Sequence, residues 1–382
     1  MNDKIRVPII WFSFFMALML FQVSYMNIGT ITALGTLAIA IITAFTHNSV
    51  DYRKLYMPTE SILLLLFFII TAGVSLIRGG FPSFFDRFSA QILLCIVFLA
   101  FRPKLNQKEN NYLFNVYVIS ASIYALLTIL SCIQLGSLRY YHARIEILGT
   151  KLDPNFIGLP FIIASTLFLS NVFAEKRKVF WLIGYGICAA AIVFTASRGN
   201  MVSLLIANAG VVIYSIFQRR TSIHRKVFFI LLVLLMGYFA INYFSTNMTL
   251  QWTRMTTFED ASDNGRLVLW DNAIEAWKSS PLLGQGLGGM YRLHGKATHN
   301  TYLELLSETG LVGTLLFLSF LIRMIKRVYH CNKVLFCALI GMLVHIAFLD
   351  SIDNRCVWIL LCWIALMPEV KIDRTANKGS TI

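Results

Sequence analysis

The sequence predicts an all-α polytopic membrane protein with about twelve transmembrane helices. Of its 382 residues, 57% are hydrophobic and only 14% are charged, whereas about 25% are charged in an ordinary soluble protein. Runs such as SILLLLFFII and VFFILLVLLMGYFAINYF approach the roughly 20 apolar residues that cross a hydrocarbon core. They do not alternate between apolar and polar residues, which argues against an outer-membrane barrel.

We treat residues 1–382 as one integral membrane domain. The first apolar run follows MNDKIR without a small-residue cleavage site, so it is predicted to be a retained span. Hydropathy places the spans at 7–24, 28–46, 60–77, 87–101, 112–135, 155–174, 179–197, 200–217, 227–245, 301–322, 334–350 and 356–368. A long loop, 246–300, precedes the last three spans, and no internal repeat of the kind found in transporters is visible.

Basic residues predict the orientation. With the N-terminus in the cytoplasm, 21 of the 33 Lys and Arg residues fall on the inner side and 12 on the outer side, as the positive-inside rule requires. We therefore expect both termini in the cytoplasm and the long loop on the periplasmic, or outer, face of the inner (plasma) membrane. Basic loops also explain the net charge of +14, so nucleic-acid binding is not predicted.

The outer basic residues differ in kind from the inner ones. Nine of the twelve are arginines, and arginine presents a permanently charged fork that matches phosphate oxygens. An arginine-rich outer face favours an anionic ligand there, although each arginine could instead snorkel or pair with a loop carboxylate such as Glu146. The seven cysteines contain no CxxC, and no Asp-rich motif occurs. Neither a disulfide, a metal nor another cofactor is expected.

Two short motifs lie at predicted span ends. FTASRGN places Arg198 at the outer end of the seventh span, and LGTKLDPNFIG places Asp153 and Pro154 at a helix start with Asn155 at the lip of the sixth span. Simpler roles stay open, because Arg198 could snorkel and the Asp153-Pro154 pair could only cap a helix.

The long loop contains a predicted amphipathic helix. Its apolar stripe consists of Leu267, Trp270, Ile274 and Trp277. Asp263 or Asn264 can cap its start, and the Pro and Gly of SSPLLGQG end it. We expect this helix on the outer membrane surface, with packing against the bundle as the alternative. Both arrangements place Arg266 in its first turn, beside the membrane.

The segment ATHNTYLELLSETGLVG joins a polar helix start to an apolar span. Thr301 and Glu304 have capping-box spacing, and the free N–H groups at this helix start suit an anion. His299 could accept a proton from a sugar hydroxyl, because imidazole titrates near neutral pH. Glu304 or Glu308 could orient the ring, although a structural role for His299 stays open. The preceding GQGLGGM spells GxGxxG, but no strand precedes it, so a tight turn is expected rather than a dinucleotide site.

These motifs together resemble the O-antigen polymerase and ligase family. The resemblance rests on SRG at a span end, R-x-x-x-W in GRLVLW, P-x-x-G-x-G in PLLGQG and HNTYLELLSETGLVG, and it is strong over about residues 153–322. It implies a metal-independent, inverting glycosyltransferase that acts on undecaprenyl-diphosphate-linked glycans. It further implies that Arg198 and Arg266 hold the diphosphate and that His299 activates the acceptor hydroxyl. We expect supporting or sugar-binding roles for Asn155, Arg292, Asn300, Tyr302 and Glu304.

Three functions are compatible with the sequence. Many ligases of this family read H-x-H-N, and Ala297 replaces the first histidine here, which favours a polymerase that joins repeat units over a ligase that moves the glycan to lipid A core. The expected partners are membrane lipids, undecaprenyl-diphosphate-linked oligosaccharide, a flippase and chain-length regulator proteins. The third hypothesis is a flippase or other transporter, supported by His345 and Asp350 inside the expected span 334–350.

Overall fold

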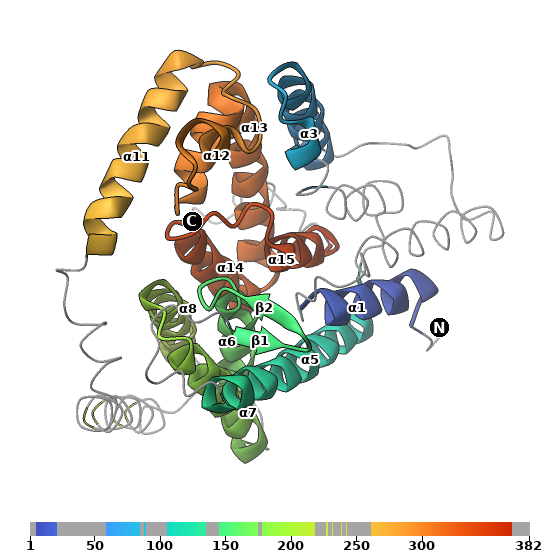
Figure 1. Ribbon diagram of the computed structural model, residues 1–382. Coiled ribbons are helices and arrows are strands. Elements are labelled where there is room, and N and C mark those ends of the chain that lie inside the picture. The colour runs from blue at the N-terminus through green and yellow to red at the C-terminus, as the bar shows by residue number, and fades with distance from the viewer. Residues whose placement is uncertain are drawn as a thin grey trace, which may run out of the picture.

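The computed structural model describes residues 5–20, 59–84, 88, 105–134, 145–174, 178–217, 227, 231, 238, 242 and 261–368. In these ranges the chain is almost entirely helical, with one short β-hairpin (Figure 1). The elements are α1 (Val7–Leu20), α3 (Thr59–Ile77), α5 (Gln107–Gln134), β1 (Ile145–Ile147), β2 (Thr150–Leu152), α6 (Gly158–Ala174), α7 (Lys178–Phe194), α8 (Arg198–Phe217), α11 (Ala261–Ser279), α12 (Gly289–His294), α13 (Thr301–Cys331), α14 (Lys333–Ile346) and α15 (Arg355–Ala365).

This is a helical membrane protein. Among the described helices, α3, α5, α8 and α13 are long and apolar enough to cross a bilayer, and α6, α7, α14 and α15 are shorter apolar helices. Each predicted span inside the described ranges coincides with one of the helices. The predicted spans 28–46, 87–101 and 227–245 lie outside the described residues, apart from a few single positions, so the number twelve stays a prediction.

Two groups of helices pack around α6 and α13. α6 contacts α5, α7, α8 and α14, whereas α13 contacts α3, α11 and α14. Phe67 of α3, Phe317 of α13 and Trp358 of α15 form an aromatic cluster, with ring centroids 5.3 Å apart for the first pair and 6.1 Å apart for the second. Aromatic pairs at this spacing add to the hydrophobic gain from burial. The cluster therefore anchors α15, and the loop before it, to the rest of the bundle.

Segments expected on the same side of the membrane contact one another. On the expected cytoplasmic side, Arg327 of α13 pairs with Glu60 of α3, and both side chains are buried. Arg327 also donates to the Ala365 carbonyl of α15 at 2.7 Å. On the expected outer side, the Arg78 side chain at the other end of α3 donates to Ser280 Oγ at 3.2 Å. The contacts therefore agree with the alternation of spans.

The hairpin is the exception to the all-α prediction. β1 and β2 pair antiparallel with Ile147 opposite Thr150. Between the strands, Leu148 (φ 50°) and Gly149 (φ 76°) are both left-handed, as in a two-residue type I′ turn. Three-residue strands are too short to register in a hydropathy window of about 19 residues. The hairpin leads directly into the Asp153-Pro154-Asn155 turn.

α11 lies alongside α13 (Figure 1) but does not bury the predicted stripe. Its buried face carries Leu269, Ala273 and Ala276, and the two alanines form a cluster with Met290 of α12. Leu267, the first member of the stripe, is 56% exposed. Small residues permit a closer helix approach, so the helix packs on the face of Ala273 and Ala276 and leaves its predicted stripe at the periphery, exposed or only partly buried. Contact of that periphery with lipid stays a prediction.

The predicted start of α11 is wrong. The helix begins at Ala261, so Asp263 and Asn264 lie inside it rather than at its cap. Its predicted end is confirmed, because the helix stops at Ser279, just before Pro281.

α13 is broken at Gly310, which divides its polar beginning from its apolar span. Gly310 has φ 65° and ψ −170°, a conformation that only glycine adopts readily. The turn before α12 satisfies the backbone on both sides of the break. Gly286 N donates to the Glu308 carbonyl at 2.9 Å, and Leu311 N donates to the Pro281 carbonyl at 2.9 Å. The glycine-rich motif is therefore a tight turn packed on helix backbone, as predicted.

Gly310→Ala should destabilise the protein by at least about 2 kcal/mol, because alanine tolerates this backbone conformation poorly. Its Cβ would also lie 2.3 Å from the Leu282 carbonyl oxygen. Thermal unfolding of the purified protein in detergent measures the change. Gly186→Ala is the control, since a Cβ on that α7 glycine meets nothing within 4 Å. Equal melting temperatures for the two variants would contradict the strain at Gly310.

Candidate functional site

His299 lies between α12 and α13, immediately before the residue that caps α13. Its backbone is left-handed, with φ 53°, which is uncommon for a residue other than glycine. The next residue, Asn300, accepts hydrogen bonds from the N–H groups of Tyr302 and Leu303 through its side-chain oxygen. The His299 side chain is 43% exposed, so a ligand can reach its ring.

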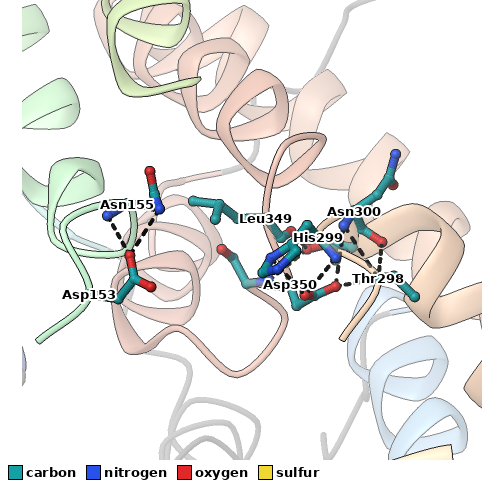
Figure 2. Close-up of polar contacts among 9 residues, drawn as sticks. Asp153, Asn155, Thr298, His299, Asn300, Leu349 and Asp350 are labelled. Carbon is teal, nitrogen blue, oxygen red and sulfur yellow. Dashed lines mark hydrogen bonds and ion pairs between the residues drawn. The ribbon is translucent and has the colours of Figure 1, made fainter. Parts of the chain in front are cut away.

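A carboxylate from the loop between α14 and α15 holds this backbone (Figure 2). Asp350 accepts from His299 N at 2.7 Å and from Asn300 N at 3.2 Å, and the Thr298 hydroxyl donates to the same carboxylate. The Asp350 side chain is only 8% exposed. Hydrogen bonds to a charged, buried acceptor are among the strong ones in proteins. The left-handed turn at His299 lets successive N–H groups converge on one carboxylate.

The same carboxylate faces the imidazole. His299 Nδ1 lies 3.5 Å from Asp350 Oδ2, which is longer than a good hydrogen bond but close enough to stabilise a positive charge on the ring. Because Nδ1 faces the carboxylate, Nε2 on the opposite side of the ring can meet a substrate. A histidine with a buried carboxylate behind it is a recurring arrangement for a general base.

Thr301 does not form the predicted capping box with Glu304. The N-cap of α13 is Asn300, and the Thr301 hydroxyl has other partners. It donates to the Leu349 carbonyl at 2.6 Å and accepts from Ser351 N at 2.8 Å. Thr301 therefore pins the loop on both sides of Asp350.

The remaining polar residues of α13 join it to its neighbours. Tyr302 donates its hydroxyl to a backbone carbonyl of α14 at 3.0 Å, and Glu308 accepts from Met290 N of α12 at 3.3 Å. The Glu304 side chain is 4% exposed. The carboxylate beside the imidazole is thus that of Asp350, rather than that of Glu304 or Glu308.

Arg292 braces the glycine-rich turn. Its Nη1 donates to the Leu287 carbonyl at 2.6 Å and its Nη2 donates to the Gln285 carbonyl at 2.8 Å. A Cβ on Gly80 would lie 2.7 Å from Arg292 Nη1, so the guanidinium also packs against the end of α3. Both ends of the fork are therefore used within the protein.

Asn155 lies in a turn that packs against the loop of Asp350. Its side-chain and backbone nitrogens both donate to Asp153 Oδ1, at 3.0 and 2.8 Å. The Asn354 side chain donates to the Phe156 carbonyl at 3.4 Å. Figure 2 shows the Asp153–Asn155 turn and the His299–Asp350 pair in one view, with Leu349 between them.

Arg198 begins α8, and the residue after it packs against the same loop. A Cβ on the next residue, Gly199, would lie 3.1 Å from Phe348 Cβ, two residues before Asp350. The structure therefore brings the helix start that carries Arg198 to the loop that holds His299.

Arg266 is carried by α11, which packs beside α13. Its side chain is partly exposed. Within the described ranges, no hydrogen bond or ion pair joins Arg266 to His299. The structure therefore places Arg266 on a neighbouring helix without fixing it directly to the site.

Two comparisons with known proteins bear on this arrangement. Residues 183–318 match the family model described as O-Antigen ligase. The ComP-specific O-oligosaccharyltransferase of Acinetobacter baylyi is 24% identical over 347 residues, which cover 80% of this chain and 61% of that protein. The chain thus spans about three fifths of the length of this curated relative.

The resemblance to the O-antigen ligase family is confirmed. The segment that matches the O-antigen ligase model contains Arg198, Arg266 and His299 and ends before Asp350.

The predicted location of Asp350 is also wrong. This residue was expected inside the span 334–350, whereas α14 ends at Ile346, and Asp350 lies in the following loop. The polar string DSIDN after Leu349 is a signal for a span end, but nothing local links it to a histidine 51 residues earlier.

Asp350→Ala should lower the free energy of unfolding by about 3 kcal/mol, because two backbone N–H groups and one hydroxyl lose a charged acceptor. Chemical or thermal unfolding in detergent measures this change. Asp271→Ala removes an exposed carboxylate of α11 and should change stability by less than about 0.5 kcal/mol. Indistinguishable variants would show that the Asp350 contacts do not stabilise the turn.

Proposed function

We propose that this chain is a membrane glycan transferase of the O-antigen ligase type. It would move a glycan from undecaprenyl diphosphate to an acceptor hydroxyl, with the site on the periplasmic or outer face and both termini in the cytoplasm. The observation that carries the proposal is the half-exposed His299 ring held against buried Asp350. The O-antigen ligase match over residues 183–318, which contain His299, supports it.

On the acceptor side, His299 would act as the general base. Its Nε2 takes the proton of the acceptor hydroxyl while the hydroxyl oxygen attacks the anomeric carbon. Asp350 stabilises the imidazolium that forms, since the carboxylate lies 3.5 Å from Nδ1. A positioned base of this kind contributes about 10²–10⁴-fold to a rate.

On the donor side, Arg198 and Arg266 would hold the diphosphate. As the bond between the anomeric carbon and the phosphate oxygen breaks, negative charge grows on the lipid diphosphate. Fixed guanidinium groups stabilise that charge, and losing one such contact typically costs about 3 kcal/mol of barrier. Direct displacement would invert the anomeric configuration, and undecaprenyl diphosphate would leave with its electron pair. No metal or cofactor takes part in this proposal.

A ligase-type reaction and polymerisation differ in the molecule that accepts the glycan. The relative's name, O-oligosaccharyltransferase, favours transfer to the hydroxyl of a separate acceptor, either a protein or lipid A core. A polymerase, which the sequence favoured because of Ala297, is the second candidate. In that case the acceptor is the sugar of another lipid-linked repeat unit, and a flippase and chain-length regulator would be partners.

The transporter hypothesis was based on His345 and Asp350 within one span, and the structure supports only the position of His345. Asp350 lies in a loop beyond α14 rather than within a span, and it binds the backbone before α13. His345 is in the last turn of α14. A membrane-embedded pair of titratable groups therefore no longer supports transport.

His299→Ala should reduce transfer by about 10²–10⁴-fold, because the acceptor hydroxyl loses its base. The assay uses protein in vesicles supplied with lipid-linked oligosaccharide and an acceptor, and gel mobility separates single additions from long chains. A ligase yields glycosylated acceptor, whereas a polymerase yields a ladder of lengths on lipid.

His294→Ala is the matched control, since this histidine lies five residues earlier and is exposed on α12. It should transfer glycan at nearly the wild-type rate. Full activity of the His299→Ala variant would exclude the proposed base.

Arg266→Lys should impair transfer by about tenfold to a hundredfold despite the retained charge, because an ammonium group cannot form two parallel bonds to a diphosphate. The loss should be measured as a lower rate of transfer when the concentration of the lipid-linked donor is limiting. Arg323→Lys changes an exposed arginine of α13 and should leave the rate unchanged. Wild-type turnover by the Arg266→Lys variant would show that the fork is unnecessary.

A further inference from the structure

Asn200 is a fully buried amide at the start of α8, two residues after Arg198. Its side chain is 0% exposed. Asn200 Nδ2 donates to the Pro154 carbonyl at 3.2 Å and lies 3.4 Å from Thr195 Oγ1. One amide group therefore joins the turn before α6 to the turn between α7 and α8.

Gly158 makes this junction possible. A Cβ on Gly158, the first residue of α6, would lie 2.2 Å from Asn200 Nδ2 and 2.3 Å from Asn200 Cγ. Only a residue without a side chain lets the amide reach Pro154. The glycine that ends DPNFIG therefore leaves the space that the asparagine of SRGN fills.

The turn joined by Asn200 is also bonded on its other side. Asn354 donates to the Phe156 carbonyl at 3.4 Å and accepts from Cys356 N at 3.0 Å as the cap of α15. Asn354 lies four residues after Asp350, in the loop that holds His299. A continuous series of contacts thus runs from the Arg198 helix start, through the turn, to the His299–Asp350 pair.

We propose that Asn200 is a positioning residue that fixes Arg198 and Asn155 relative to His299, through its bond to the Pro154 carbonyl. The proposal rests on the proposed function. Asn200 itself is buried and does not touch the substrate. Its role is to hold the donor-binding side at a set distance from the base, and a displacement of about 1 Å in such a site can cost about 10²-fold in rate.

Asn208 provides a matched control. It is an asparagine on the same helix, also buried, and its Nδ2 donates to the Tyr185 hydroxyl at 3.1 Å. Removing the Asn208 side chain deletes its bond to Tyr185, and removing the Asn200 side chain deletes its bonds to Pro154 and Thr195. Only the Asn200 side chain, of these two, is bonded to the turn that carries Asn155.

The experiment compares Asn200→Ala and Asn208→Ala in vesicles, at equal amounts of folded protein. Asn200→Ala should lower kcat by at least about tenfold and should raise the inhibition constant of inorganic pyrophosphate, used as a probe of the donor side. The KM for the acceptor should stay unchanged, because Asp350 holds His299 independently. Asn208→Ala should lie within about twofold of wild type in all three values.

Asn354→Asp is the second variant in case Asn200→Ala does not fold. It keeps an acceptor for Cys356 N, and so the cap of α15, but loses the donor to Phe156. It should show a smaller change of the same kind. If the wild type does not transfer glycan, the proposed function and this inference both fail. A different result is that the wild type transfers glycan while Asn200→Ala and Asn208→Ala lower kcat equally and leave the inhibition constant of pyrophosphate unchanged. That result would overturn the positioning role alone.

Discussion

The site depends on one buried carboxylate. Asp350 collects the N–H groups of His299 and Asn300 and the hydroxyl of Thr298, and these bonds offset the left-handed backbone at His299. Strained backbone of this kind costs about 1–3 kcal/mol and persists only where surrounding contacts impose it. The loop of Asp350 is anchored by α15 and by Thr301. The position of the imidazole therefore depends on the packing of the helix bundle.

The groups with proposed roles in chemistry are divided between elements that meet at this loop. His299 belongs to the start of α13, Arg198 to the start of α8, and Asn155 to the turn before α6. Each lies at or next to a helix start, where the positive end of the helix dipole favours an anion. The proposed diphosphate donor would therefore meet both the charge of Arg198 and oriented helix dipoles.

Local pattern predicted the helices well and the contacts between them poorly. Long apolar runs define α3, α5, α8 and α13, because the bilayer demands about 20 apolar residues whatever the tertiary packing. His299, Asn300 and Arg198 were proposed as site residues because motif and helix start coincide, and their roles stay predictions. Asp350 was missed because its partner is 51 residues away in sequence. The face of α11 that packs on the protein, with Ala273 and Ala276, was not predicted, because the apolar stripe of that helix was expected to face lipid. Contacts that depend on which helices become neighbours, such as the pair of Arg327 and Glu60, have no local signature.

The break at Gly310 has a mechanical consequence. An unbroken helix of 31 residues would act as a stiff lever, so that any tilt of its lipid-embedded part would swing His299 sideways. The discontinuity replaces the helical hydrogen bonds at that point with bonds to the turn before α12, which is itself tied to the end of α3. The two parts of α13 are thus separate segments, so a tilt of the apolar part need not move the first turns, next to which His299 lies.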